Sequence, residues 1–89
     1  MLKILYSVYD KKSQTYAQPL AEINDGTAQR LVCDIIARQP DHPWSKYPED
    51  FELVRVGTFN ELHGQVTDEA DPAGTVVQME TLKHLVTGE

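Results

Sequence analysis

Lysine side chains stand beside aromatic ones at two places in this sequence. One group is Trp44, Lys46 and Tyr47, and the other is Tyr9, Lys11 and Lys12. Aromatic rings can stack on unpaired bases, at about 1–3 kcal/mol per base, while neighbouring cations neutralise phosphates. These six side chains are therefore candidate contacts to a single-stranded nucleic acid.

Arg55 completes the candidate set. It lies in the run Phe51–Phe59, where strand alternation places it on the same face as Phe51 and Phe59. All seven side chains also have an ordinary interpretation, because most aromatic rings of a small domain lie in its core and a lysine pair at a turn is commonly just solvated. The pattern alone is thus only a weak indication of nucleic-acid binding.

Catalytic and metal-binding motifs are not found. The three histidines are scattered along the chain, at His42, His63 and His84. A single cysteine, Cys33, allows neither a disulfide nor a zinc-finger spacing, and the helical pattern around it favours a buried position. The adjacent Glu49 and Asp50 would point to opposite faces of a strand, so they do not form an acid–base pair. We expect a protein that is not an enzyme and uses no cofactor or metal.

Composition indicates one small soluble domain and gives no hint of DNA. The chain has 89 residues and a formal net charge of −6, whereas a non-specific duplex-binding domain is usually basic. Residues 1–67 carry seven Lys and Arg against nine Asp and Glu, so a local positive surface is still possible. No apolar run approaches the roughly 20 residues of a membrane helix, and no signal peptide is recognised.

Residues 2–9 and 15–23 have the composition of two strands that form a hairpin, with Pro19 at an edge or a bulge. Asn24 is a typical helix N-cap. Apolar residues then recur at helical spacing up to Pro40, which ends the helix: Ala28, Leu31, Val32, Ile35 and Ile36. A proline-rich connector, 39–50, leads to an alternating strand over 51–59 and a short strand over 65–67.

Residues 76–86 are expected to form a short helix that docks on the domain or on a second copy, through Met79, Leu82 and Val86. The predicted fold class is therefore α+β, a small antiparallel sheet in ββαββ order with one amphipathic helix on one face and a short C-terminal helix. We expect residues 1–67 to form the core domain, and residues 68–89 an acidic linker and C-terminal segment. A domain this small commonly self-associates, so a homodimer is predicted.

The segment Pro43–Phe59 resembles the signature of a known family. Its aromatic–Ser–Lys–aromatic–Pro–Glu–Asp connector runs directly into the alternating strand. It is similar to the small nonstructural DNA-binding protein of microviruses, the gokushovirus-type single-stranded DNA bacteriophages. The resemblance extends in order over roughly residues 3–66.

The resemblance implies a phage nonstructural protein that binds single-stranded DNA during genome replication or packaging. Such a protein would work in the cytoplasm of the bacterial host, would not be part of the virion, and would have no membrane partner. The alternative is a protein-interaction module that contacts viral replication or procapsid proteins, or a host factor, without touching DNA. Its support is the negative net charge and the apolar segment 76–86.

Overall fold

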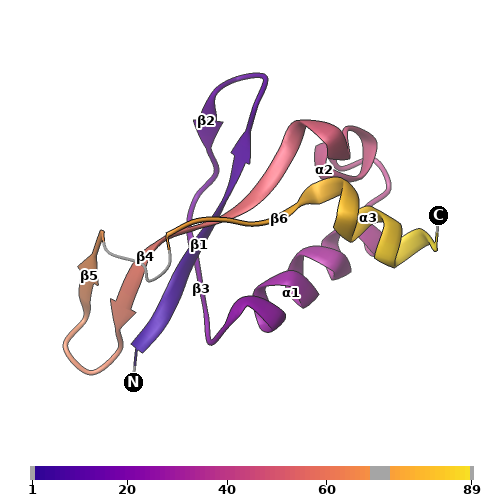
Figure 1. The fold of residues 1–89 in the computed structure, drawn as a ribbon. Helices are drawn as coiled ribbons and strands as arrows, with labels where there is room; N and C mark the ends of the chain where they lie inside the picture. The colour runs from indigo at the N-terminus through magenta and orange to yellow at the C-terminus, as the bar shows by residue number, and fades with distance from the viewer. Residues whose placement is uncertain (1, 69–72, 89) are drawn as a thin grey trace.

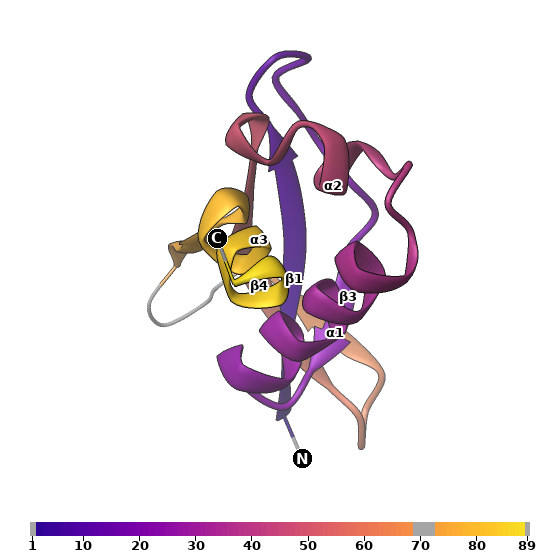
Figure 2. The same cartoon turned by 90° about the vertical axis from the view of Figure 1, so that its right-hand side faces the viewer.

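The computed structural model describes residues 2–68 and 73–88, which form two layers: a twisted antiparallel sheet and helices on one of its faces (Figures 1 and 2). The strands are β1 (Leu2–Asp10), β2 (Thr15–Tyr16), β3 (Leu20–Glu22), β4 (Phe51–Asn60), β5 (Gln65–Thr67) and β6 (Gly74–Gln78). The helices are α1 (Asp25–Arg38), α2 (Pro43–Lys46), the 3-10 helix η1 (Pro48–Asp50) and α3 (Met79–Thr87). The predicted α+β class is confirmed.

The long strands β1 and β4 pair antiparallel at the centre of the sheet. β2 and β3 both pair with the other side of β1, and β5 and β6 both pair with the other side of β4. The strand predicted over 15–23 is therefore two strands. Pro19 lies in the gap between them and has no N–H to donate to a neighbouring strand, while Ser7 Oγ donates to the Ala17 carbonyl at 2.7 Å.

The predicted cap of α1 is confirmed. Thr27 N donates to Asn24 Oδ1 at 3.0 Å, and Asn24 N donates to Thr27 Oγ1 at 3.3 Å, which makes a reciprocal capping box. The buried face is narrower than predicted, because α1 meets the core along a single row of residues spaced by four. That row is Ala28, Val32 and Ile36, whereas Leu31 is 38 % exposed and Ile35 is half-buried.

A bulge at Val56 corrects the predicted face of β4. Arg55 pairs with Tyr6 and Gly57 pairs with Leu5, so Val56 has no partner of its own on β1. Tyr6 and Leu5 are neighbours on β1 and point to opposite faces, and directly paired residues share a face. Arg55 therefore lies on the helix-covered face, but Gly57 and, beyond it, Phe59 lie on the outer face.

The C-terminal segment contains a strand that the sequence pattern did not predict. β6 extends the sheet beside β4, and α3 begins only at Met79. Met79 and Leu82 are fully buried in the same core as α1, so α3 docks on its own domain and the predicted dimer contact through these residues is wrong. Residues 74–87 thus share one core with residues 2–67, and residues 69–72 of the predicted acidic linker lie outside the described residues.

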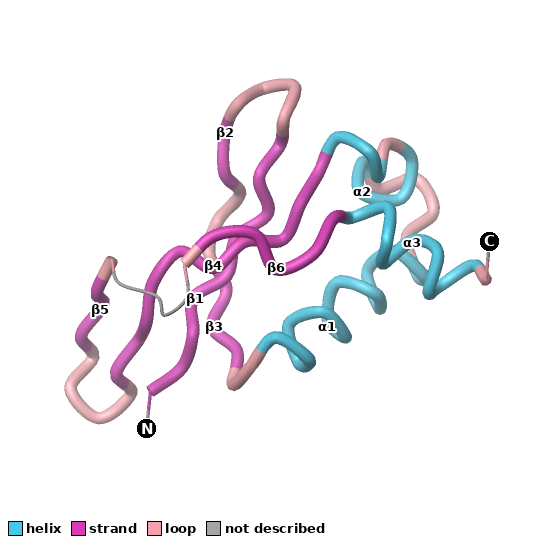
Figure 3. Tube along the Cα trace, viewed as in Figure 1, coloured by secondary structure: helices cyan, strands magenta, loops and turns pink. Residues whose placement is uncertain are grey.

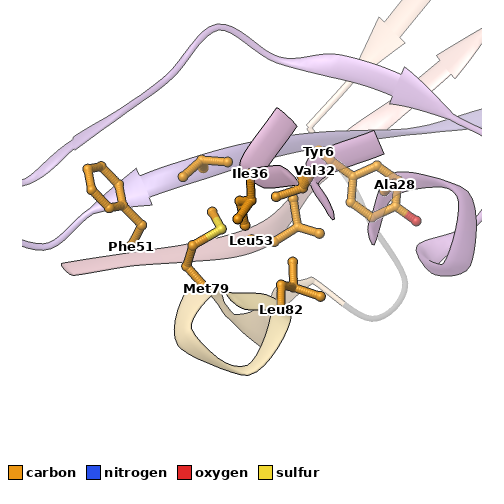
Figure 4. Close-up of a cluster of buried hydrophobic side chains, with 9 residues drawn as sticks. Tyr6, Ala28, Val32, Ile36, Phe51, Leu53, Met79 and Leu82 are labelled. Atoms are coloured by element: carbon orange, nitrogen blue, oxygen red, sulfur yellow. The ribbon is translucent and has the colours of Figure 1, made fainter. Parts of the chain in front are cut away.

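The core is gathered between the sheet and the two long helices, as the side chains in Figure 4 show. Leu53 from β4 lies among α1 and α3 residues such as Val32 and Leu82, and all three are fully buried. Tyr6 contributes a fully buried ring whose hydroxyl reaches the start of α1. Burial of this one face accounts for the amphipathic pattern of both helices.

Ile36→Ala should lower the free energy of unfolding by about 2–5 kcal/mol, because it leaves a cavity between α1 and the sheet. Leu31→Ala on the same helix is the matched control, and its cost should be much smaller because Leu31 is partly solvated. Urea unfolding of both variants measures the difference. Equal losses would show that the assigned buried row is wrong.

Gly57→Ala should also be destabilising, by about 1–3 kcal/mol. A Cβ at this position would lie 2.3 Å from the Thr67 carbonyl oxygen, so β5 would have to move away from β4. Thermal unfolding gives the loss, and amide exchange of Val66 and Thr67 should quicken in the variant. Unchanged melting and exchange would contradict this close approach of β5 to Gly57.

Candidate nucleic-acid interface

The segments that carry the two lysine–aromatic groups are well separated in sequence but adjacent at one end of the molecule. The β1–β2 hairpin projects there beside the connector that runs through α2 and η1 (Figures 2 and 3). Lys11 N donates to the Asp50 carbonyl at 2.8 Å, which ties the hairpin to the end of η1. We define this end, made of the hairpin tip and residues 42–50, as the hairpin–connector end.

Lys11 holds this end together. Its Nζ donates to Gln78 Oε1 at 2.6 Å and approaches the Glu49 carbonyl at 3.4 Å. Gln78 in turn donates to Glu52 Oε2 at 2.8 Å. The ammonium group thereby links β1, η1 and the junction of β6 with α3, so Lys11 positions the interface even though its side chain is largely exposed.

Lys12 occupies the exposed tip of the hairpin. The turn is shaped by Asp10, whose Oδ1 accepts from Lys12 N at 2.9 Å, and by Gln14, which has a left-handed φ of 59°. The contact to Asp10 involves only the Lys12 backbone, and Lys12 itself is exposed. Lys12 is thus suited to meet an anion without first breaking a tertiary contact.

Tyr9 forms a cross-strand pair with Tyr16, with ring centroids 4.7 Å apart and planes tilted by 43°. Tyr16 is 61 % exposed and was not among the predicted site residues. The sequence does contain a signal for Tyr16. Tyr9 and Tyr16 are at similar distances along the chain from the hairpin tip, and such positions pair across a hairpin. Since Tyr9 pairs with Glu52 on β4, this aromatic pair lies on the outer face of the sheet.

Ser45 anchors the connector. Its buried hydroxyl donates to the Gln39 carbonyl at 2.8 Å and to the Ile36 carbonyl at 3.2 Å, satisfying the end of α1. Its own carbonyl accepts from Lys83 Nζ at 2.9 Å, which adds a link to α3. The connector is therefore a fixed part of the fold, and it presents the residues on either side of Ser45 in defined directions.

Trp44 and Tyr47 differ in their exposure. Trp44 is half-buried, packs against the core, and contacts His42 edge-on at 4.7 Å between ring centroids. Tyr47 is 51 % exposed, and Lys46 Nζ stands 5.9 Å from its ring centroid. Within the connector, Tyr47 and Lys46 offer a ring and a cation to solvent, whereas much of Trp44 serves the core.

Arg55 lies away from the other candidates, on the helix-covered face. Its Nε donates to Asp25 Oδ1 at 2.9 Å, and its Nη2 forms a second, ion-paired bond to Asp25 Oδ2. The Arg55 side chain is only 16 % exposed. The prediction that Arg55 contacts phosphate is corrected accordingly: alternation from Leu53 puts Arg55 on the helix-covered face, where Asp25 is its partner.

The Arg55–Asp25–Tyr6 cluster shifts the pKa values of all three members, and the hydrogen bond to Asp25 raises that of Arg55. Burial alone would raise the pKa of Asp25, but hydrogen bonds from Arg55 and Tyr6 outweigh it and hold that pKa below its usual value. Burial, with the hydrogen bond to Asp25 and its charge, raises the pKa of Tyr6 well above its ordinary range. The cluster thus keeps a charged carboxylate and a neutral phenol at the start of α1.

The hairpin–connector end combines rings with cations, but acids are interspersed. Glu49 is exposed beside Lys46, and Glu52 is held by Gln78. Such an arrangement can stack planar groups and pair with a few phosphates, which is a binding chemistry.

Two other kinds of site were sought as well. In the described part of the chain, no three His, Cys, Asp or Glu side chains are grouped as metal ligands. No helix within the described ranges has the length and apolar character needed to span a bilayer.

Asp25→Asn should lower stability at neutral pH and flatten the acid limb of the stability profile. Because the folded-state pKa of Asp25 is depressed, its contribution is present above the unfolded value of about 3.9 and is lost as pH falls through the folded value. Urea unfolding across this pH range measures the effect. Asp34→Asn, at an exposed carboxylate of the same helix, is the control, and an identical acid limb in both variants would contradict the assignment.

Comparison with known proteins gives a family for the chain. The family model described as Phage ORF5 protein matches residues 3–84, a range that runs from β1 through β6 and into α3. No curated protein and no solved structure matches the chain. Because the match covers most of the sequence, this chain belongs to the Phage ORF5 protein family.

Proposed function

We propose that this phage protein binds single-stranded DNA through its hairpin–connector end. The observation that carries the proposal is that Lys11 ties the hairpin, with Tyr9, Tyr16 and Lys12, to the end of the connector that carries Lys46 and Tyr47. Rings that bear cations beside them suit unpaired bases joined by phosphates. A duplex hides the faces of its bases, so this chemistry favours the single strand.

The residues of this end have separate roles in binding. Tyr16 and Tyr47 supply stacking surface, and Lys12 and Lys46 supply charge, while Lys11 holds the hairpin against η1. This division revises the sequence-based assignment, in which Trp44 was a stacking residue and Arg55 a phosphate contact. The acidic remainder of the protein repels phosphate elsewhere, so binding is confined to one end.

The resemblance of Pro43–Phe59 to the microvirus nonstructural protein supports the same ligand and adds a setting. On that basis the protein acts without catalysis in the cytoplasm of the bacterial host, during genome replication or packaging, and is not part of the virion. The connector that carries the resemblance is also the element that Ser45 fixes against α1 and α3. The resemblance and the candidate site therefore coincide in the structure.

The interaction-module alternative has lost one of its two supports. The first support is the apolar segment 76–86, which could dock on its own domain or on another chain, and its Met79 and Leu82 are fully buried in the chain's own core. The negative net charge remains. We therefore put single-stranded DNA ahead of a viral replication protein, a procapsid protein or a host factor as the ligand of the hairpin–connector end.

A fluorescence titration with a short single-stranded oligonucleotide across a salt series tests the proposal. Affinity should fall as salt rises, with a slope of about −0.7 per neutralised phosphate, and duplex of the same sequence should bind more weakly. Lys12→Ala and Lys46→Ala should each weaken binding and reduce the slope by about one contact. Tyr47→Ala should weaken binding but preserve the slope, because stacking releases no counterions.

Arg30→Ala is the matched control, since it removes an exposed cation from α1 rather than from the hairpin–connector end. It should bind nearly as the parent does. If Lys12→Ala, Lys46→Ala and Tyr47→Ala all bind like the parent, or if Arg30→Ala weakens binding as much as they do, the hairpin–connector end is not the DNA site. If the parent protein binds no oligonucleotide, the interaction-module alternative takes precedence.

A further inference from the structure

A row of four side chains crosses the outer face of the sheet at the hairpin–connector end. Tyr16 on β2 pairs with Tyr9 on β1, and Tyr9 pairs with Glu52 on β4. Glu52 pairs in turn with Gln78 on β6. Directly paired residues share a face of the sheet and have Cβ atoms about 4.5–5.5 Å apart. The Glu52 side chain therefore lies beside the Tyr9–Tyr16 pair, on the face where that pair is exposed.

The Glu52 carboxylate is held in place by a chain of hydrogen bonds. Gln78 Nε2 donates to Glu52 Oε2 at 2.8 Å, and Lys11 Nζ donates to Gln78 Oε1 at 2.6 Å. An ammonium group can only donate and a carboxylate can only accept, so these partners fix the orientation of the Gln78 amide. Glu52 is thus oriented by the fold before any ligand arrives.

One oxygen of this carboxylate is open to a ligand. Within residues 2–68 and 73–88, the bond from Gln78 to Oε2 is the one hydrogen bond made by the Glu52 side chain. In these ranges no buried side-chain nitrogen or oxygen lacks a partner, so Oε1 is in contact with solvent. The edge of the tyrosine pair therefore carries an oriented hydrogen-bond acceptor.

A carboxylate beside a DNA-binding surface repels phosphates, but it can favour a base that offers it a hydrogen-bond donor. Cytosine, adenine and guanine carry an exocyclic amino group, whereas thymine presents carbonyl oxygens and a methyl group. In duplex DNA, glutamate accepts a hydrogen bond from the cytosine N4 amino group. A base stacked on the tyrosine pair can meet Glu52 in the same way.

We propose that Glu52 selects among the bases that stack on the Tyr9–Tyr16 pair, favouring a base with an exocyclic amino group over thymine. The amino group donates to Glu52 Oε1, and Gln78 is a positioning residue that keeps this oxygen at the edge of the pair. Thymine is disfavoured because its O4 oxygen would face the carboxylate, and two acceptors repel each other. This inference rests on the proposed function and adds a base preference to it.

The affinities for two single-stranded oligonucleotides of equal length, one of cytosines and one of thymines, test this preference at neutral pH. Both bases are pyrimidines, and cytosine has an amino group where thymine has the O4 oxygen. The parent should bind the cytosine oligonucleotide about tenfold more tightly, the effect of roughly 1.4 kcal/mol. Glu52→Gln should bring the ratio of the two affinities close to one, because an amide can donate to thymine O4 as well as accept from cytosine N4.

The ratio of affinities separates a base contact from a change of charge. Glu52→Gln also removes a negative charge, which should strengthen binding to both oligonucleotides alike. Glu49→Gln is the matched control, because it removes the same charge from an exposed residue of the same end and should keep the parent's ratio. Gln78→Glu retains an acceptor for Lys11 but has no donor for Glu52, so its ratio should fall. Circular dichroism of each variant shows that it is folded.

The outcomes distinguish this inference from the proposed function. A parent that binds both oligonucleotides equally or prefers thymine, or a Glu52→Gln variant that keeps the parent's ratio, would overturn the role of Glu52 and leave single-stranded DNA as the ligand. Loss of the ratio in Glu49→Gln would show that charge rather than position sets the preference, and would overturn it too. If the parent binds neither oligonucleotide, the proposed function fails and this inference fails with it.

Discussion

The antiparallel pairing of β1 with β4 is the constraint on which the rest of the structure depends. These two strands carry four shorter ones along their outer sides, and both long helices pack against one of their faces. Tyr6 and Leu53, one from each strand, are fully buried against the helices. Within the described residues, the helices pack on only one face of the sheet.

The bulge at Val56 changes which residues of β4 face the helices on either side of it. Up to Arg55 the alternation of β4 sends apolar residues toward the helices, and beyond it the faces exchange. Arg55 is the last residue before the bulge and still faces the helices, where it reaches Asp25 at the start of α1. Tyr6 also donates to Asp25, so a cluster of three side chains joins the sheet to the helix. Beyond the bulge, Gly57 and Phe59 lie on the outer face, where the Thr67 carbonyl oxygen approaches Gly57 closely.

The lysines serve two purposes, and the tertiary contacts tell them apart. Lys11 and Lys83 hold elements together through Gln78 and the Ser45 carbonyl. Lys46 instead stands over an exposed ring, and its charge is available to a ligand. An acidic protein can bind an anion when such charges are confined to one end, because the acids elsewhere only limit where the ligand approaches.

The sequence by itself determined the α+β class, the cap and periodicity of α1, and the membership of Met79 and Leu82 in an apolar helix face, since these depend on local spacing and side-chain type. Only the tertiary structure decided that β6 joins the sheet, because Gly74–Gln78 is too short for its pattern to indicate a partner strand. Only it decided that Arg55 pairs with Asp25, because these residues are 30 positions apart and meet only when α1 packs on the sheet. Only it decided that Phe59 faces away from Arg55, because one unpaired residue on β4 reverses every later side chain. The proximity of Lys11 to the connector likewise follows from strand pairing across 38 residues of sequence, a distance that no local pattern spans.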